Sequence, residues 1–267
     1  MKKWKTIVKC AVGVSHQQQN LPCQDYGDYF IFKERCLLGA VADGAGSAKY
    51  SDIGSKIAVN TAISFLKAYF DELIEKKRLF PQIPRQNTPN INQAQNLYSD
   101  LLKEVLKAIN EEAQRLNCSY QDLACTLIIF FALPNSITAM QIGDGFLAVR
   151  PVDGDLQLLF TPDKGEYINE TTFITSSNAF EEMQVKVLEK PCSFICASTD
   201  GLEKVAINFK DWQPFPPFFN PLEEYMKETV ETHEDDQYII DFLNSERLNA
   251  RTNDDKTLLL ALLTELN

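Results

Sequence analysis

Residues 41–52 read VADGAGSAKYSD, and they join two segments whose apolar residues follow different periods. The preceding residues 36–40, CLLGA, form a short apolar run of the kind that makes a buried strand. From Ser51 to about Lys77, apolar residues recur every three or four positions, which predicts a helix. An Asp-Gly pair between a strand and a helix is either a turn or a place where a carboxylate and a backbone carbonyl hold a ligand.

The composition of the whole chain is that of a globular protein. Its 267 residues are 45% hydrophobic, which is enough for one large domain or two small ones. Because no composition break marks a linker, we expect residues 1–267 to form a single domain. The net charge of -11 disfavours nucleic acid and anionic membranes as partners. No stretch approaches the roughly 18 uncharged apolar residues of a membrane helix, so we expect a cytoplasmic protein, acting as a monomer.

The cysteines give no sign of a disulfide framework or a zinc site. There are seven of them, an odd number, and none belongs to a Cys-x-x-Cys pair. Most lie inside apolar runs, so we expect buried, reduced thiols.

The order of apolar segments predicts an α+β fold. Strand patterns cover residues 4–14 and 28–42, and a second helix begins at Leu97. Four strand patterns over residues 122–160 predict an antiparallel meander, and they are followed by two more strands, one or two helices and a closing strand, at 183–189, 192–199, 221–249 and 256–263. We therefore expect a central antiparallel β-sandwich of two packed sheets flanked by helices on both faces, a four-layer α-β-β-α arrangement.

Asp-Gly pairs occur at four places in the chain, and they are not equivalent. Asp153-Gly154 lies between two strand patterns, which predicts a two-residue hairpin turn. Asp43 and Asp200 each end a strongly apolar strand, and the chain after them does not return as a strand. Asp254 precedes the last strand, so antiparallel strands of one sheet would bring these three carboxylates to one edge. Singly each aspartate is more often a cap or turn residue, but the set favours a site for Mg²⁺ or a similar hard cation.

The order of these segments resembles that of a known family, the metal-dependent protein phosphatases of type 2C (PPM family). The resemblance runs from about Gly13 to Leu260 and covers nearly the whole chain. The matching segments are GVSHQQQNLPCQDY (13–26), AVADGAGSA (40–48), ACTLIIFFA (124–132), MQIGDGFLAVR (140–150), CASTDGLEKV (196–205) and NDDKTLLL (253–260). Each segment alone is weak evidence, whereas their shared order is specific.

The resemblance implies two Mg²⁺ or Mn²⁺ ions and assigns their ligands. Asp43 would bridge the ions, Asp200 and Asp254 would bind one of them, and the Gly44 carbonyl would bind the other. Asp25, which ends the first motif, would act mostly through metal-bound water. A third, weaker metal position would use Asp144 together with Asp200, and its occupancy stays open. A water bridging the two ions would attack the phosphorus directly, without a protein nucleophile.

Two positions depart from the family pattern. Where many members carry a phosphate-binding arginine, five residues before Asp25, this chain has Asn20, so a bidentate clamp is missing. Where some members carry a histidine proposed to protonate the leaving oxygen, this chain has Ala45. His16 lies in the same loop as Asp25 and is the available substitute for either role, although a lone histidine is more often a structural hydrogen-bonding residue. The other histidine, His233, lies in an acidic run that we interpret as a solvated surface.

The leading prediction is a signalling enzyme of bacterial style that hydrolyses phosphoserine and phosphothreonine in a phosphorylated protein, a partner serine/threonine kinase being one candidate substrate. An alternative is a catalytically weak protein of the same fold that binds phosphoproteins or acts as a regulatory module, and the missing arginine motivates it. The presence of Asp25, Asp43, Asp200 and Asp254 argues against this alternative, because a site that no longer binds metal has no need of four ligands. A hydrolase of a small phosphorylated molecule is a third reading that the sequence leaves open.

Overall fold

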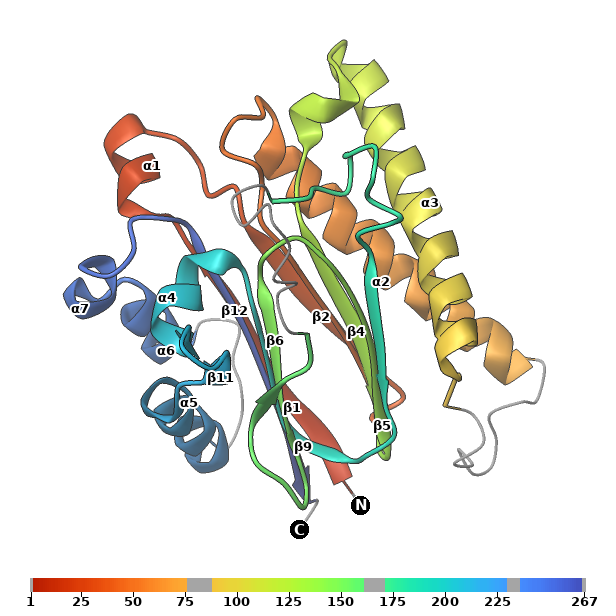
Figure 1. The fold of residues 1–267 in the computed structure, drawn as a ribbon, viewed down its shortest axis with the longest axis vertical. Helices are drawn as coiled ribbons and strands as arrows, with labels where there is room; N and C mark the ends of the chain where they lie inside the picture. Colours follow the sequence, from red (N-terminus) through yellow and green to blue (C-terminus); the bar gives the residue numbers. More distant parts are fainter. Residues whose placement is uncertain (1, 76–87, 161–170, 230–235, 266–267) are drawn as a thin grey trace.

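Two five-stranded antiparallel sheets pack face to face at the centre of the protein, as seen in a computed structural model that describes residues 2–75, 88–160, 171–229 and 236–265. The strand order is β1-β12-β9-β6-β7 in the first sheet and β2-β3-β4-β5-β8 in the second. Figure 1 shows α2 and α3 on one side of the strands and α4 to α7 on the other. The predicted β-sandwich flanked by helices on both faces is therefore confirmed.

The strands of the first sheet are β1 (Lys2–Ala11), β6 (Phe146–Pro151), β7 (Gln157–Leu158), β9 (Cys192–Ser198) and β12 (Lys256–Glu265). Those of the second are β2 (Tyr26–Phe32), β3 (Cys36–Ala42), β4 (Leu127–Leu133), β5 (Ser136–Ile142) and β8 (Gln184–Leu188). A separate two-stranded sheet consists of β10 (Ile207–Asn208) and β11 (Gln213–Pro214).

The helices are α1 (Val14–Gln19), α2 (Ser51–Glu75), α3 (Ile91–Leu116), α4 (Glu203–Ala206), α5 (Pro216–Glu228), α6 (Gln237–Leu243) and α7 (Glu246–Asn249), with short 3₁₀ helices η2 (Tyr120–Leu123) and η3 (Asp200–Leu202). Among the described helices, none is long and apolar enough to cross a membrane. The single domain over residues 1–267 stays a prediction.

Three apolar cores separate the four layers. The core between the sheets includes Phe130, Ile195 and Leu259, all fully buried. A second core packs α2 and α3 on the second sheet, and a third packs α5 and α6 on the first sheet. Because β3 is covered on both faces, every one of its residues is buried, which explains why its sequence is a continuous apolar run rather than an alternating one.

The helix α3 begins at Ile91, six residues before the predicted start at Leu97. Its first turns are polar, so hydrophobic periodicity cannot detect them. A capping box marks the true start, in which the Asn90 side chain accepts from the Gln93 N–H and the Gln93 side chain accepts from the Asn90 N–H, both at 3.0 Å.

The predicted meander over residues 122–160 is only partly right. β4 pairs with β5 and β6 pairs with β7, but β5 pairs with β8 rather than with β6. The turn at residues 143–145 carries the chain from the second sheet to the first, where β6 pairs with β9. Gly143 has a φ of 104°, and a Cβ there would lie 2.4 Å from Cγ2 of Thr126, so only glycine fits. Asp144 therefore lies at a crossover between the sheets.

The hairpin predicted at Asp153-Gly154 is present, but its two-residue turn is wrong. β6 ends at Pro151 and β7 begins at Gln157, so residues 152–156 form a longer loop. The Gly154 N–H donates to the Pro151 carbonyl at 3.2 Å. The register of β6 against β9 shifts between Arg150 and Pro151, and the proline ends the regular strand there.

The core between the sheets generates a stability prediction. Phe130 is fully buried there, and its ring leaves no room for a Cβ on Gly39 of the neighbouring strand, since that atom would lie 2.5 Å from the ring. We expect Phe130→Ala to lower the free energy of unfolding by about 3–5 kcal/mol in urea titrations. Phe180, which is 43% exposed, supplies the control, and Phe180→Ala should stay within about 0.5 kcal/mol. Equal unfolding midpoints for the two variants would contradict this packing.

Candidate active site

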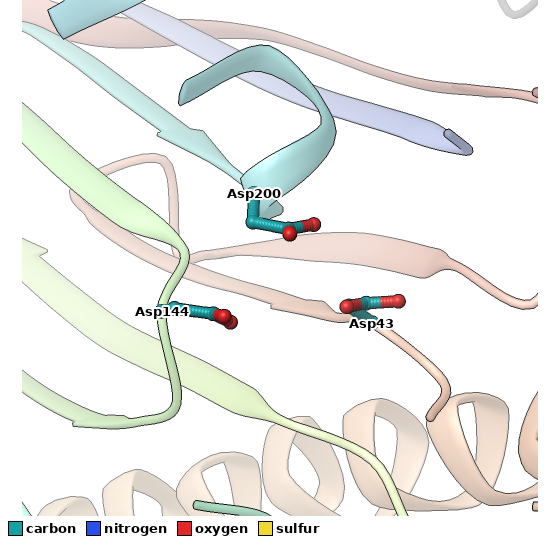
Figure 2. Close-up of side chains that lie close together, drawn as sticks. All are labelled: Asp43, Asp144 and Asp200. Carbon is teal, nitrogen blue, oxygen red and sulfur yellow. The ribbon is translucent and has the colours of Figure 1, made fainter. Parts of the chain in front are cut away.

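Three aspartates from separate segments meet where the two sheets come together. Asp43 follows β3, Asp144 lies in the turn between β5 and β6, and Asp200 is the first residue of η3 after β9. One carboxylate oxygen of each lies within 4.8 Å of the others. Figure 2 shows the three side chains around a common space, each from a different segment of the chain.

This arrangement corrects one part of the sequence prediction. Asp43 and Asp200 do not lie on one edge of one sheet, because β3 belongs to the second sheet and β9 to the first. The expectation holds only for Asp200 and Asp254, whose strands β9 and β12 are antiparallel neighbours with Ser198 opposite Leu258. The site is therefore assembled across the sandwich, and packing between the sheets sets its geometry.

Asp43 is held in place by its backbone. Its N–H donates to Oγ1 of Thr126 at 2.9 Å, and its carbonyl accepts from the Thr126 N–H at 2.8 Å. The next residue, Gly44, cannot carry a side chain, because a Cβ would lie 2.7 Å from the Gln24 carbonyl oxygen and 2.8 Å from that of Ser51. The glycine is thus required by close approach of three backbone segments.

Asp25 is buried close to Asp43. Burial raises the pKa of both carboxyls, and at Asp43 the charges of Asp25, Asp200 and Asp254 raise it further. Oγ1 of Thr199 donates to Oδ2 of Asp25 at 2.6 Å and accepts from the backbone N–H of the last strand, at 3.1 Å. Sequence reasoning missed Thr199, although it directly precedes Asp200 in a matching segment.

Asp254 is exposed and lies outside the group of three, but its charge raises the pKa of Asp43 and Asp200. Its neighbour Asp255 is buried and was assigned no role from sequence. The Asp255 carboxylate accepts from the backbone N–H groups of Gly13 and Gln24, both at 2.6 Å, and contacts Nδ1 of His16 at 2.9 Å. One side chain therefore ties both ends of the first motif to the start of β12.

The contact with Asp255 gives His16 a defined orientation. A carboxylate only accepts hydrogen bonds, so Nδ1 of His16 is the donor and Nε2 is the nitrogen left for another partner. The side chain of His16 is 14% exposed, so it is partly open to solvent. His233 and most of the acidic run around it lie outside the described residues.

The two departures from the family pattern have structural explanations. Asn20 ends α1 in the left-handed conformation with a φ of 55°, and asparagine is among the few residues that adopt it readily. Ala45 is buried in a small apolar cluster with Ala48 and Ala124, and its N–H donates to the Ala124 carbonyl at 2.9 Å. These positions therefore serve the backbone and the packing here.

The donor set fits a divalent cation. Oδ1 of Asp144 is buried and finds no hydrogen-bond partner among the described residues, whereas its Oδ2 accepts from Oγ1 of Thr171. Burial first, and then the charges of Asp144 and Asp254, raise the pKa of Asp200 to about 7. A buried acceptor without a donor, next to mutually repelling carboxylates, matches the hard oxygen donors that Mg²⁺ and Mn²⁺ prefer.

Glu203 is a further acidic residue of the site that the sequence did not single out. It begins α4, directly after η3, and burial together with the charges of Asp144 and Asp200 raises its pKa to about 7. The sequence could have indicated this residue, because Glu203 follows Asp200 by three positions and residues three apart on a helix lie on the same face.

The contacts of Thr199 generate a prediction about the support of the site. Thr199→Val keeps the shape of the side chain but leaves the buried Asp25 carboxylate and the Thr257 N–H without this partner. We expect a loss of about 1–3 kcal/mol in the free energy of unfolding, measured in urea without metal. Thr199→Ser retains the hydroxyl and should lose clearly less. A valine variant as stable as the serine variant would show that these hydrogen bonds contribute little.

Comparison with known proteins places this geometry in a family. A family model described as protein phosphatase 2C matches residues 12–244. The chain is 32% identical to serine/threonine-protein phosphatase 3 of Escherichia coli K12, over 98% of this chain and 99% of the relative. Among solved structures it is similar to a bacterial serine phosphatase, with a TM-score of 0.61 at 15% identity over 98% of both chains.

A further solved structure of the same fold is the catalytic domain of the serine threonine protein phosphatase PstP in complex with two manganese ions. Its TM-score is 0.54 at 15% identity, over 99% of this chain and all of that one. The family match and the full-length relative confirm the resemblance drawn from the sequence motifs. The chain belongs to the protein phosphatase 2C family, whose members are Mg²⁺- or Mn²⁺-dependent phosphatases.

Proposed function

We propose that this protein removes phosphate from phosphoserine and phosphothreonine in proteins, with divalent cations held by Asp43, Asp144 and Asp200. The observation that carries the proposal is the convergence of these carboxylates, with one oxygen of each within 4.8 Å of the others, and a buried oxygen of Asp144 that has no hydrogen-bond partner in the described part of the chain. The name of the E. coli relative supports the substrate class.

The residues that would hold the cations are the three clustered aspartates together with Asp25, Asp254 and the Gly44 carbonyl. The two manganese ions of PstP support two ions here, and the Asp144 carboxylate offers a third position. When bound, such cations increase the acidity of coordinated water and offset negative charge on the phosphoryl oxygens.

The protein's own groups would position the attacking water and keep other nucleophiles away. The Asp25 and Asp43 carboxylates lie close together and only accept hydrogen bonds, so they are suited to orient a water molecule and take its proton. Cys125 pairs with Gly44 in an isolated bridge, but it is fully buried, and burial raises its pKa. A thiol in that state is a poor nucleophile. Hydrolysis by water therefore suits the site better than a covalent phosphocysteine route.

His16 would contact the substrate phosphate in place of the missing arginine, or protonate the leaving oxygen. Asp255 holds Nδ1 at 2.9 Å, which leaves Nε2 to act on the substrate. The same carboxylate holds the backbone next to Asp25, at Gln24, so the histidine and the acidic cluster share one support. The hydrogen bond from one ring nitrogen to a carboxylate fixes the orientation of the imidazole.

The alternative of a catalytically weak, phosphoprotein-binding member of the family has one observation in its favour, the use of Asn20 as a helix cap. Two observations speak against it: an Asp144 oxygen is buried without a partner among the residues that the structure describes, and Asp25 is buried beside Asp43 at a cost in free energy. A protein that had lost its cations would gain stability by replacing these residues, so their presence favours an active site.

We expect the parent protein and the Asp43→Asn variant to differ in activity. The parent should hydrolyse phosphoserine and phosphothreonine peptides only with Mn²⁺ or Mg²⁺, and the variant should lose at least about a hundredfold in kcat/KM, because a site ligand is gone. A small substrate, p-nitrophenyl phosphate, tests separately for activity without a protein-like substrate. Equal activity in the two proteins, or no activity in either while metal is bound, would contradict the proposal.

The same substitution has an opposite effect on stability. Without metal, Asp43→Asn removes one of several repelling carboxylates, so thermal unfolding should shift upward by about 2 °C or more. With Mn²⁺ at a hundredfold excess over its Kd, the parent should gain about 2.7 kcal/mol and the variant much less. A metal-free variant less stable than the parent would show that Asp43 is a structural residue.

A substitution of His16 tests its proposed role at the substrate. His16→Ala should lower kcat/KM for phosphopeptides by about tenfold or more, since a hydrogen bond to a charged group is lost. Gln17→Ala, on the same short helix, is the matched control and should behave like the parent. If His16→Ala leaves both KM and kcat unchanged, the histidine belongs to the fold and not to the site.

A further inference from the structure

A concave site lies on the outer side of the first sheet, among the helices that cover it. It is a cleft of about 850 Å³ between α4, the β10–β11 hairpin, α5, α6 and α7. Figure 1 shows these elements gathered together on the side of the sandwich opposite α2 and α3. A cleft of this size is in the range of ligand and peptide sites in proteins.

The charge of the cleft is opposite to that of the protein. None of its described lining residues is Asp or Glu, although the chain carries a net charge of -11. Four lining residues are basic, and all four are exposed: Lys204, Lys210, Arg247 and Arg251. None of them forms an ion pair with any other described residue. The positive charge of Lys204 also acts on the carboxylates of Asp200 and Glu203, whereas the charges of Lys210, Arg247 and Arg251 are available to an anionic partner.

Most of the remaining lining is apolar, and two of its aromatic rings pack on neighbouring rings. Phe209, Phe215 and Tyr238 are 45%, 46% and 48% exposed, and they are three of the most exposed large apolar side chains of the described chain. The Tyr238 ring stacks on Tyr225 at 4.1 Å, and the Phe209 ring packs edge-on against Trp212 at 5.2 Å. Exposed aromatic side chains that are already ordered provide contact area at a low cost in conformational entropy.

The cleft is connected to the active site through a very short stretch of chain. η3 begins with Asp200, α4 follows without a break, and Lys204 of α4 already lines the cleft. A segment bound in the cleft would therefore lie close to a phosphorylated residue at the carboxylates. This geometry suits a site that recognises the protein around the phosphorylation site.

We propose that the cleft docks an acidic peptide segment with an aromatic or aliphatic anchor, and that this segment belongs to the phosphoprotein substrate. The docking role rests on the proposed phosphatase function, whereas the binding itself does not. The basic side chains of the cleft select acidic residues, and its aromatic and proline residues accept the apolar anchor. The acidic rest of the surface would repel such a segment elsewhere, which makes the cleft selective.

Direct binding tests the cleft without any catalysis. The probe is a fluorescein-labelled, unphosphorylated peptide of alternating Asp or Glu with Phe and Leu, and its fluorescence anisotropy is measured with the full-length protein. We expect saturable binding that weakens as salt is raised, and binding about tenfold weaker in the double variant Arg247→Glu, Arg251→Glu. Tyr238→Ala should weaken binding without changing the salt dependence.

Two controls define the result. Lys186→Glu reverses an exposed charge on β8, in the other sheet, and should bind the peptide like the parent. A peptide with Lys in place of every acidic residue should not bind. Equal binding of acidic and basic peptides, or equal weakening in Lys186→Glu and the double variant, would overturn the proposal.

Kinetics then test the link to the active site. A phosphoserine peptide extended by the acidic segment should have a KM several-fold below that of the unextended peptide, and the double variant should lose this difference while its kcat for p-nitrophenyl phosphate is unchanged. If the peptides bind but none is hydrolysed, the phosphatase proposal is wrong, while the proposal that the cleft binds an acidic peptide is retained. If hydrolysis is normal and the extension has no effect on KM or binding, the docking proposal fails alone. If the cleft binds oleate and not the peptide, its ligand is an anionic lipid and the docking proposal is wrong. If the protein forms a dimer that the double variant abolishes, the cleft binds a second copy of the chain and the proposal is likewise wrong.

Discussion

The mutual repulsion of carboxylates held where two sheets meet is the constraint on which the rest of this structure depends. Asp43 comes from the second sheet, Asp200 from the first, and Asp144 from the turn that joins them. Burial and neighbouring charge raise the pKa of Asp43 and Asp200, which means that the folded chain holds these groups at a cost in free energy. Such a cost is expected at functional sites, where the surrounding fold must supply the compensating stability.

That stability comes from the three apolar cores and from a few hydrogen bonds that act over long stretches of sequence. Thr126 fixes the backbone of Asp43, and Thr199 holds the Asp25 carboxylate. Asp255 accepts from both ends of the first motif and orients His16. The acidic residues are thus held by hydrogen bonds from neighbouring segments, and Asp255 also orients His16.

The fold could be predicted from the sequence because buried strands and helices leave local patterns, and three of the predicted site residues, Asp43, Asp144 and Asp200, lie together in the structure. β3 and β12 are continuous apolar runs, and the aspartates stand where those runs end or begin. The partition of strands between two sheets was not predictable in this way. β5 and β6 look like a hairpin, but the turn between them passes from one sheet to the other, and Gly143 in that turn has no room for a Cβ beside Thr126. The roles of Thr199 and Asp255 also escaped, because their hydrogen-bond partners lie far away in the sequence and no local pattern reports such contacts.

Divalent cations should bind where the two sheets meet, between the clustered carboxylates. The most direct measurement is anomalous diffraction from crystals of the protein grown with Mn²⁺. We predict anomalous peaks between the carboxylates of Asp43, Asp144 and Asp200, within bonding distance of Oδ1 of Asp144. A fully occupied Mn²⁺ elsewhere on the protein, with none among these three carboxylates, would contradict the account.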